Sequence, residues 1–169
     1  MRIFNYIFII TSLLILSRHR YGVTGNSMYP NLKPGQHVLT LRKRKSLSFL
    51  RRSDIVVLNN PENIVDHGNS FIKIIKRIVG LPGEHIKLVG STIYANGTPL
   101  IEDYLIPGYE KWTDRYGEQE WLLSEDEYLV ISDNRPEGAD SRKFGPIRSE
   151  HIVGIVWLSW RPFKIRHHR

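Results

Sequence analysis

The hydrophobic positions of the chain change their pattern near residue 20. Residues 3–16 contain no charged side chain, whereas later hydrophobic residues come in short runs rich in Ile and Val. Pro-Gly and Asn-Gly dipeptides separate several of these runs, as is typical of strands joined by tight turns. The pattern predicts strands over residues 38–41, 54–58, 70–79, 84–89, 92–95, 127–131 and 151–157. We therefore expect one mainly β domain behind an apolar N-terminal segment, and no further helix.

The sequence around Asn96-Gly97 predicts a β-hairpin. Both residues tolerate positive φ, as a two-residue hairpin turn requires, and short strand-like segments flank them. Asn96 also begins an Asn-x-Thr sequence, which is a glycan acceptor in secreted proteins. The flanking alternation favours the hairpin.

The apolar run at residues 3–16 has two main interpretations. A cleaved signal peptide has a hydrophobic region of roughly 7 to 15 residues, whereas a membrane-spanning helix needs about 20. No small-x-small cleavage site follows Leu16, because the next residues, Ser-Arg-His-Arg-Tyr, are charged or bulky. We therefore expect an uncleaved, single-pass membrane-anchor helix over residues 1–22, with Arg18 snorkelling to the interface. A single β domain would then occupy residues 23–169.

Composition narrows the possible chemistry. The 169 residues are enough for one domain with its own core. Because the chain has no cysteine, it cannot form disulfides, use a thiolate nucleophile or bind zinc or iron–sulfur clusters through thiolates. No two of its seven histidines are spaced i, i+3 or i, i+4 on a helix-like segment. We therefore expect no metal site.

Positive charge is concentrated in the first third of the chain. The net charge is +7, but residues 1–53 hold ten Lys and Arg and no acidic residue, so the remainder carries −3. This asymmetry indicates contact with the phosphates of nucleic acid or of anionic lipid. A nucleic-acid-binding domain would not account for the apolar run, so we expect membrane lipids and no nucleic acid as partners. The basic stretch at residues 42–52 would lie on lipid headgroups or form a solvated loop.

A serine follows the predicted anchor in the sequence Gly-Asn-Ser-Met-Tyr-Pro, residues 25–30. A turn here would present the hydroxyl and backbone N–H of Ser27 to a bound extended chain, as a nucleophile with an oxyanion donor requires. The same composition is common in ordinary loops. This segment alone therefore does not assign a function.

Strand alternation over residues 71–79 predicts a lysine on an apolar face. Successive side chains of a strand point to opposite faces, so Ile74, Lys76 and Ile78 share one face. Ile75 and Arg77 share the other. Full burial lowers the pKa of a lysine from about 10.4 by about 3 to 5 units. Lys76 would then be able to accept a proton from a serine hydroxyl; the alternative is an edge-strand lysine whose stem covers the sheet.

Charged residues alternate in a Gly- and Pro-containing loop at residues 132–145. The loop holds two Asp-x-Arg units, Asp133/Arg135 and Asp140/Arg142. Loops of this composition are usually solvated turns. The regular alternation of acid and base favours ion pairs that hold the loop against a site.

Together, these three segments resemble the type I signal peptidases, membrane-anchored serine proteases that use a Ser-Lys dyad. The resemblance runs through Ser-Met-Tyr-Pro at residues 27–30, Lys-Arg-Ile-Val-Gly-Leu-Pro-Gly-Glu at 76–84, and Asp-Asn-Arg…Asp-Ser-Arg…Phe-Gly at 133–145. With the apolar segment in front, it covers nearly the whole chain. It implies the family's coiled, antiparallel, barrel-like β architecture with an N-terminal anchor helix, no metal or organic cofactor, and preproteins with signal peptides as substrates.

The resemblance also implies roles for individual residues. Ser27 would be the nucleophile and its N–H an oxyanion donor, with Lys76 as general base and an acyl-enzyme as intermediate. The implied supporting residues are Arg77, Asp133, Arg135, Asp140 and Arg142, with Arg77 paired to Asp133 and Asp140 to Arg142. The implied substrate pocket consists of Val23, Met28, Leu32, Ile74 and Ile75. The substrate would bind as an added strand, with small residues at the first and third positions before the cut.

Two positions depart from the family pattern. Gly25 stands where some members have a hydroxyl residue that supplies a second oxyanion donor. Gly138 stands where some members have a serine that hydrogen-bonds the lysine, so that the backbone, water or Ser132 would replace it. Removal of one oxyanion donor lowers kcat about 10²- to 10³-fold in other proteases. These departures leave the catalytic efficiency open.

Two further expectations concern topology and a rival function. The charges that flank the apolar run favour a cytoplasmic β domain under the positive-inside rule. Family members instead have their catalytic domain on the outer, trans face, where preproteins are cut, and we expect the same here.

Self-cleaving repressors of the SOS type share the Ser-Lys chemistry, but they have a DNA-binding domain before the protease, for which the segment before residue 25 leaves no room.

Overall fold

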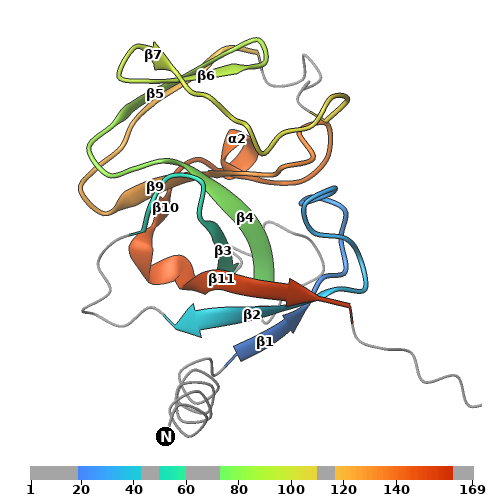
Figure 1. Cartoon of the computed structure of the whole chain (residues 1–169). Coiled ribbons are helices and arrows are strands. Elements are labelled where there is room, and N and C mark those ends of the chain that lie inside the picture. The colour runs from blue at the N-terminus through green and yellow to red at the C-terminus, as the bar shows by residue number, and fades with distance from the viewer. Residues whose placement is uncertain (1–18, 43–49, 60–72, 110–116, 162–169) are drawn as a thin grey trace, which may run out of the picture.

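The computed structural model describes residues 19–42, 50–59, 73–109 and 117–161. They form two antiparallel sheets (Figure 1), with the strand orders β1-β2-β11-β3-β4-β9-β10 and β7-β6-β5-β8. The predicted mainly β class is confirmed. The barrel-like closure is not: within the described residues, the larger sheet has two free ends, at β1 and β10.

The strands of the larger sheet are β1 (His19–Gly22), β2 (His37–Arg42), β3 (Ile55–Asn59), β4 (Lys73–Gly80), β9 (Glu127–Ile131), β10 (Ile147–Arg148) and β11 (Ile152–Trp160). The smaller sheet consists of β5 (His85–Val89), β6 (Thr92–Ala95), β7 (Thr98–Pro99) and β8 (Gln119–Leu122). Two short helices, α2 (Ser141–Phe144) and η3 (Ser149–His151), lie near the end of the chain. Each predicted strand has a counterpart, whereas β1, β8, β10 and both helices were not expected.

The predicted anchor at residues 1–22 overlaps the described structure only at its end. Residues 1–18 lie outside the described residues, so the anchor helix stays a prediction. Residues 19–22 differ from it: they form β1, which pairs with β2 so that His19 lies opposite Thr40. The hydroxyl of Thr40 donates to the backbone oxygen of His19 at 3.1 Å. No helix among the described residues has the length and apolar character needed to span a membrane.

The last strand, β11, lies in the middle of the larger sheet. It pairs with β2 on one side and with β3 on the other. Gly154 allows the close approach to β2, because a Cβ there would lie 2.5 Å from the backbone oxygen of Leu41. β11 thus joins the part of the sheet that leads to Ser27 to the part that contains Lys76.

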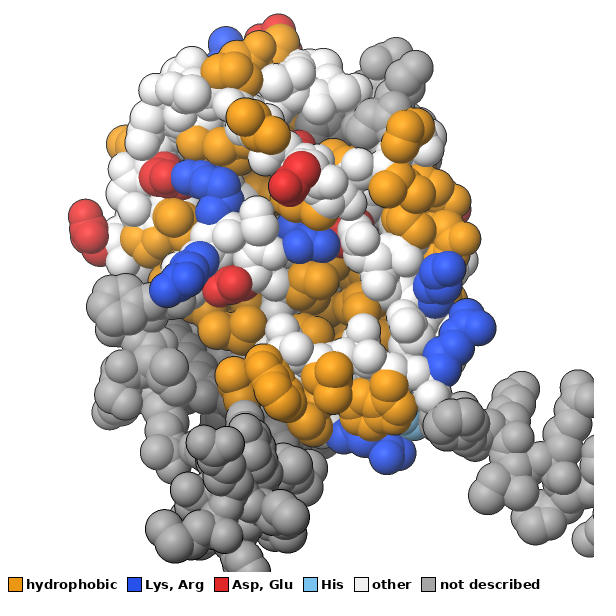
Figure 2. All heavy atoms as spheres, viewed as in Figure 1, with side chains coloured by type: hydrophobic (Ala, Val, Ile, Leu, Met, Phe, Trp, Pro, Cys, Tyr) orange, Lys and Arg blue, Asp and Glu red, His pale blue; other side chains and the backbone are white. Residues whose placement is uncertain are grey.

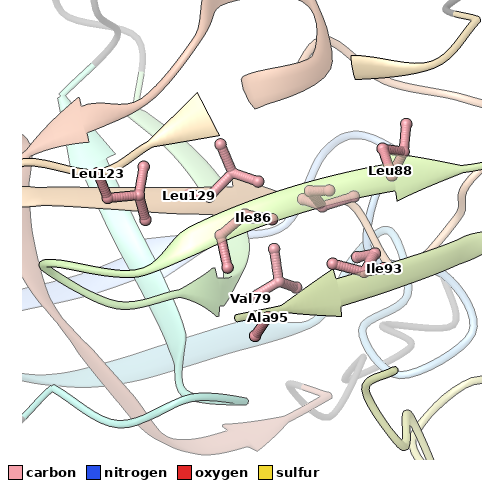
Figure 3. Packing of buried hydrophobic residues seen from close by; sticks show 8 residues of the cluster. Val79, Ile86, Leu88, Ile93, Ala95, Leu123 and Leu129 are labelled. Carbon is pink, nitrogen blue, oxygen red and sulfur yellow. The ribbon is translucent and has the colours of Figure 1, made fainter. Parts of the chain in front are cut away.

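Hydrophobic side chains from both sheets pack together in one core cluster (Figure 3). Val79 and Leu129 come from the larger sheet, and Ile86, Leu88 and Ile93 from the smaller sheet. All five are at most 1% exposed. Burial on this scale stabilises a domain by about 25 cal/mol for each Å² of apolar surface, so the cluster ties the two sheets into one unit.

Residues of β4 follow the predicted alternation. Ile74 and Ile78 pack in a cluster with Val56 of β3, whereas Ile75 packs against a different cluster that contains Met28. The predicted hairpin is confirmed as well: the residues between β6 and β7, Asn96 and Gly97, have φ values of 49° and 78°.

Candidate active site

Ser27 lies in the loop that connects β1 to β2. Asn134, which is distant in sequence, holds this loop in place. Its backbone N–H donates to the backbone oxygen of Ser27 at 2.9 Å. Its side-chain amide donates to the oxygen of Asn26 at 3.2 Å. A local turn completes the loop, in which the N–H of Leu32 donates to the oxygen of Met28 at 2.7 Å. Two backbone carbonyls of the loop therefore accept hydrogen bonds from Asn134.

Lys76 of β4 brings its amine to this serine. The distance from Lys76 Nζ to Ser27 Oγ is 2.9 Å, within hydrogen-bond range. Lys76 is only 3% exposed, and its neighbour on β3, Val56, is fully buried. The lysine predicted on an apolar face is thus buried, with its amine in contact with a hydroxyl.

The surroundings of Lys76 favour the neutral amine. Burial lowers the pKa of Lys76 from 10.5 to about 8. The charges of Asp140 and Asp133 oppose this shift, and that of Arg142 adds to it. Desolvation dominates because the buried ammonium loses its hydration shell. Near pH 8, about half of the molecules therefore carry an amine that can accept a proton.

Asp140 and Arg142 form a fully buried ion pair at the start of α2. Arg142 Nε donates to Asp140 Oδ1 at 2.8 Å, and Nη2 donates to Oδ2 at 2.7 Å. Burial alone would raise the pKa of Asp140, but the hydrogen bond and charge of Arg142 hold it below its usual value. Asp140 therefore stays ionised, and it also accepts the backbone N–H of Ser132 at 3.0 Å.

Arg77 and Asp133 form a second buried pair beside Lys76. The guanidinium of Arg77 also donates to the backbone oxygen of Ser53 at 2.8 Å and lies 4.0 Å from the centre of the Tyr104 ring. Asn31 completes the group, because its side-chain amide donates to Asp133 Oδ2 at 2.9 Å. This pair links β4 to the segment that follows Ser27.

Arg135 is buried as well, but its contacts lie in another part of the molecule. Its guanidinium donates to Glu102, and its backbone N–H donates to the oxygen of Tyr109 at 3.1 Å. Its backbone oxygen accepts from Arg142 Nη1 at 2.7 Å. Arg135 therefore connects the loop at 132–145 to the segment at 102–109.

A cleft of about 580 Å³ opens beside Ser27 and Lys76. Its walls come from residues 21–28, 73–76 and 137–139. Four of the five predicted pocket residues line it: Val23, Met28, Ile74 and Ile75. The fifth, Leu32, is placed differently. It is buried in the core cluster that contains Val23 and Met28, and it does not border the cleft.

Sequence patterns missed several residues of the site. Asn134 stands inside the Asp-Asn-Arg unit at 133–135, which marked the segment but gave this residue no role. Nothing in the sequence pointed to Asn31, Glu102 or Glu137, which borders the cleft. Among the described residues, no three His, Asp or Glu side chains lie together in a way that could hold a metal ion.

Known proteins resemble this chain in sequence and in fold. The model of the signal peptidase family, peptidase S26, matches residues 1–161. Signal peptidase I V of Bacillus subtilis (strain 168) is 33% identical over 147 residues, which cover 80% of this chain and 82% of the relative. Signal peptidase I of Bacillus caldolyticus is 30% identical over 165 residues, which cover 92% of this chain and 86% of the relative.

A crystal structure of a signal peptidase I from Enterococcus faecalis V583 also resembles this chain. It is 29% identical in sequence and superposes with a TM-score of 0.50, covering 65% of this chain and 98% of that one. Sequence and fold thus agree over most of the length of both proteins. The chain belongs to the signal peptidase family, peptidase S26.

Proposed function

We propose that this protein is a signal peptidase I, a serine endopeptidase that removes N-terminal signal peptides from secreted preproteins. One observation carries the proposal: Ser27 Oγ lies 2.9 Å from the amine of the buried Lys76. A hydroxyl is a weak nucleophile until a neighbouring base takes its proton. Burial lowers the pKa of Lys76 to about 8, which suits a base that works near neutral pH.

The reaction begins with the transfer of the Ser27 proton to the neutral amine of Lys76. Ser27 Oγ attacks the carbonyl carbon at the cleavage site, and the resulting tetrahedral intermediate carries a negative oxygen. Its collapse breaks the peptide bond, and the Lys76 ammonium returns the proton to the leaving amine. Water then attacks the acyl ester, with Lys76 accepting a proton from the water. As the ester bond breaks, Lys76 returns that proton to Ser27 Oγ, and the signal peptide leaves with a new carboxylate.

The backbone N–H of Ser27 is the donor that we assign to the negative oxygen. Within the described residues this N–H makes no hydrogen bond, while Asn134 donates to the carbonyl oxygen of Ser27. A donor held in place before the reaction stabilises the developing charge without reorganisation. Gly25 adds no side-chain donor, so this site would work with fewer oxyanion contacts than one with a hydroxyl there.

The cleft supports a substrate bound in extended form. Its walls contain the end of β1 and the beginning of β4, and an extended peptide can hydrogen-bond to such segments as an added strand. Val23, Met28, Ile74 and Ile75 give the cleft an apolar lining next to Ser27. Their size suits small side chains before the cut.

Membrane attachment remains part of the proposal. The apolar residues 3–16 would anchor the chain, with the catalytic domain on the trans face of the membrane. β11 supports a membrane-facing surface, because Trp157 and Leu158 are 51% and 48% exposed. Figure 2 shows hydrophobic side chains beside Lys and Arg along the lower edge of the described part, where Figure 1 draws β1, β2 and β11. Indole rings and basic side chains are favoured at the lipid interface.

The proposal is tested by incubating the detergent-solubilised full chain with a preprotein and mapping the cut by mass spectrometry. We expect one cut, after a small-x-small sequence. Ser27→Ala should abolish it, whereas Ser91→Ala, which changes an exposed serine in the turn between β5 and β6, should leave the rate unchanged. Cleavage by Ser27→Ala at the rate of the unmodified chain would refute the proposal.

A further inference from the structure

Ser132 holds a buried hydroxyl that the mechanism above does not use. The residue is completely buried, and its Oγ has no hydrogen-bond partner within the part of the chain that the structure describes. Its backbone N–H donates to Asp140 Oδ2 at 3.0 Å. A buried polar atom without a partner destabilises the folded state. The Ser132 hydroxyl is therefore free to accept a hydrogen bond from a neighbouring group when that group becomes protonated.

The sheet register places this hydroxyl beside Lys76. Arg77 pairs with Ile131 and Ile78 with Val130 across β4 and β9. The same register, continued by one residue, puts Lys76 opposite Ser132. Residues directly opposite in an antiparallel pair share one face, with Cβ atoms about 4.5 to 5.5 Å apart. The side chains of Ser132 and Lys76 therefore start as neighbours on the same face.

Gly138 has no side chain, and the Ser132 hydroxyl lies where such a side chain would begin. A Cβ on Gly138 would lie 2.6 Å from Ser132 Oγ and 3.0 Å from Ser27 Cβ. The first distance is too short for any real contact, and the second is tight. Gly138 thus lies between the two serines, and any side chain there would displace the hydroxyl of Ser132. Ser27, which itself contacts the amine of Lys76, and Ser132 thus border the same space beside Gly138.

We propose that Ser132 is a positioning residue for Lys76, an inference that rests on the proposed function. A lysine ammonium has three N–H donors, and Ser27 Oγ accepts only one of them. When Lys76 takes the proton of Ser27, Ser132 Oγ accepts a second N–H and holds the amine in line with Ser27. The hydroxyl thus stabilises the ammonium that forms in the transition state.

Ser132→Ala tests this proposal. Loss of a hydrogen bond to a charged group should lower kcat by about tenfold or more, with KM changed less than about twofold. The acid limb of the kcat profile should move to lower pH, because the ammonium has lost an acceptor. Since the hydroxyl has no partner at rest, Tm should stay the same or rise. An unchanged kcat, or a loss of kcat that parallels a loss of Tm, overturns the proposal.

A second readout needs no substrate and separates failure of this inference from failure of the proposed function. The pKa of Lys76 is followed by NMR of ¹³C-labelled lysine, assigned with Lys76→Met, in the unmodified chain and in Ser132→Ala. We expect a lower pKa in Ser132→Ala. The matched control is Ser141→Ala, because Ser141 Oγ accepts the N–H of Val130 at 2.9 Å; it should lower Tm without moving the Lys76 pKa. An unmoved pKa in Ser132→Ala overturns the inference.

A double-mutant cycle that combines Gly138→Ala with Ser132→Ala tests whether Gly138 is needed to make room for the Ser132 hydroxyl. The strain of a side chain at φ 109° is the same with and without the Ser132 hydroxyl, so it cancels in the cycle. Gly138→Ala should therefore lower kcat by a smaller factor in the Ser132→Ala background than in the unmodified chain. If Gly138→Ala lowers kcat by the same factor in both backgrounds, its effect does not act through the Ser132 hydroxyl, and the proposal is contradicted.

Discussion

Arg77 and Asp133 face each other in a buried pair with two parallel hydrogen bonds, Nε to Oδ1 at 2.7 Å and Nη2 to Oδ2 at 2.6 Å. Arg77 directly follows Lys76 in β4, and Asp133 also accepts the amide of Asn31. The pair therefore connects the strand of the proposed base to the loop of the proposed nucleophile. Its geometry is the bidentate form in which a guanidinium binds a carboxylate most strongly.

Asp133→Ala should destabilise the protein by about 3 to 5 kcal/mol, because it leaves the buried Arg77 guanidinium without its counterion. Urea denaturation measures this change in the free energy of unfolding. The control is Glu118→Ala, which breaks the exposed contact of Glu118 with Lys87 at 3.8 Å and should cost less than about 1 kcal/mol. Similar losses in both variants would show that the buried pair does not stabilise the fold.

The pH dependence of kcat should report the base. Below about pH 8, the pKa of Lys76, the protonated amine cannot accept the Ser27 proton, so kcat should fall about tenfold per pH unit. Above it, kcat should level off. Steady-state kinetics between about pH 6 and 10 measure the profile, and a flat profile would argue against a lysine base.

Asp140→Asn should move the acid limb of the kcat profile, the fall of kcat below about pH 8, to lower pH. The charge of Asp140 raises the pKa of Lys76, so its removal makes the ammonium less stable and the neutral amine available at lower pH. Asp126→Asn is the control, because Asp126 is exposed in the turn before β9, and it should leave the limb in place. A limb that moves to higher pH in Asp140→Asn would contradict the proposed electrostatics.

Lys76→Met should abolish activity and stabilise the fold at pH 7. The unfolded lysine keeps its proton up to about pH 10.5 and the folded one only up to about 8, so the unfolded state binds more protons between these values and stability rises with pH there. At pH 7, burial of the ammonium therefore costs about 3 kcal/mol, which Met does not incur.

Denaturation with urea at pH 7 measures this gain. The difference between Lys76→Met and the unmodified chain should shrink as the pH rises from about 8 past 10.5, the ordinary lysine value, because only above that value is the lysine neutral in both states. A variant that is less stable at pH 7 would show that the ammonium is not costly in its site.

Gly25→Ser should raise kcat with little change in KM. A Cβ at Gly25 would have no heavy atom within 4 Å among those compared, so a serine fits there without displacing its surroundings. Its hydroxyl would add a second donor for the negative oxygen, and such donors are worth about 10² in kcat elsewhere. Gly25→Ala, which adds the carbon without the hydroxyl, is the control for backbone stiffening. If both substitutions change kcat equally, the hydroxyl introduced by Gly25→Ser does not act as an oxyanion donor.

Local patterns predicted much of this fold, because strand alternation is a local property. The placement of Ile74, Lys76 and Ile78 on one face follows from the period of two alone. β10 and β7 are only two residues long, too short to show any period. The sequence assigns β1 to the predicted anchor because it directly follows the apolar run, whereas its strand form depends on pairing with β2.

The site was predicted less completely, because its contacts join distant parts of the chain. The motifs pointed to Ser27 and Lys76, but no local pattern relates Asn31 to Asp133, which lie 102 residues apart. Leu32 was placed in the pocket by its position near Ser27, whereas the turn of this loop directs it into the core. The register between β4 and β9, which sets Ser132 opposite Lys76, likewise comes only from the assembled sheet.

The central place of β11 makes the larger sheet depend on a strand that comes late in the sequence. Within the larger sheet, β11 alone joins β2 to β3, and it follows every other strand that the structure describes. A chain truncated before residue 152 would still contain both residues of the proposed dyad, but it would lack the strand that joins their two parts of the sheet. We therefore expect such a truncated chain to be inactive.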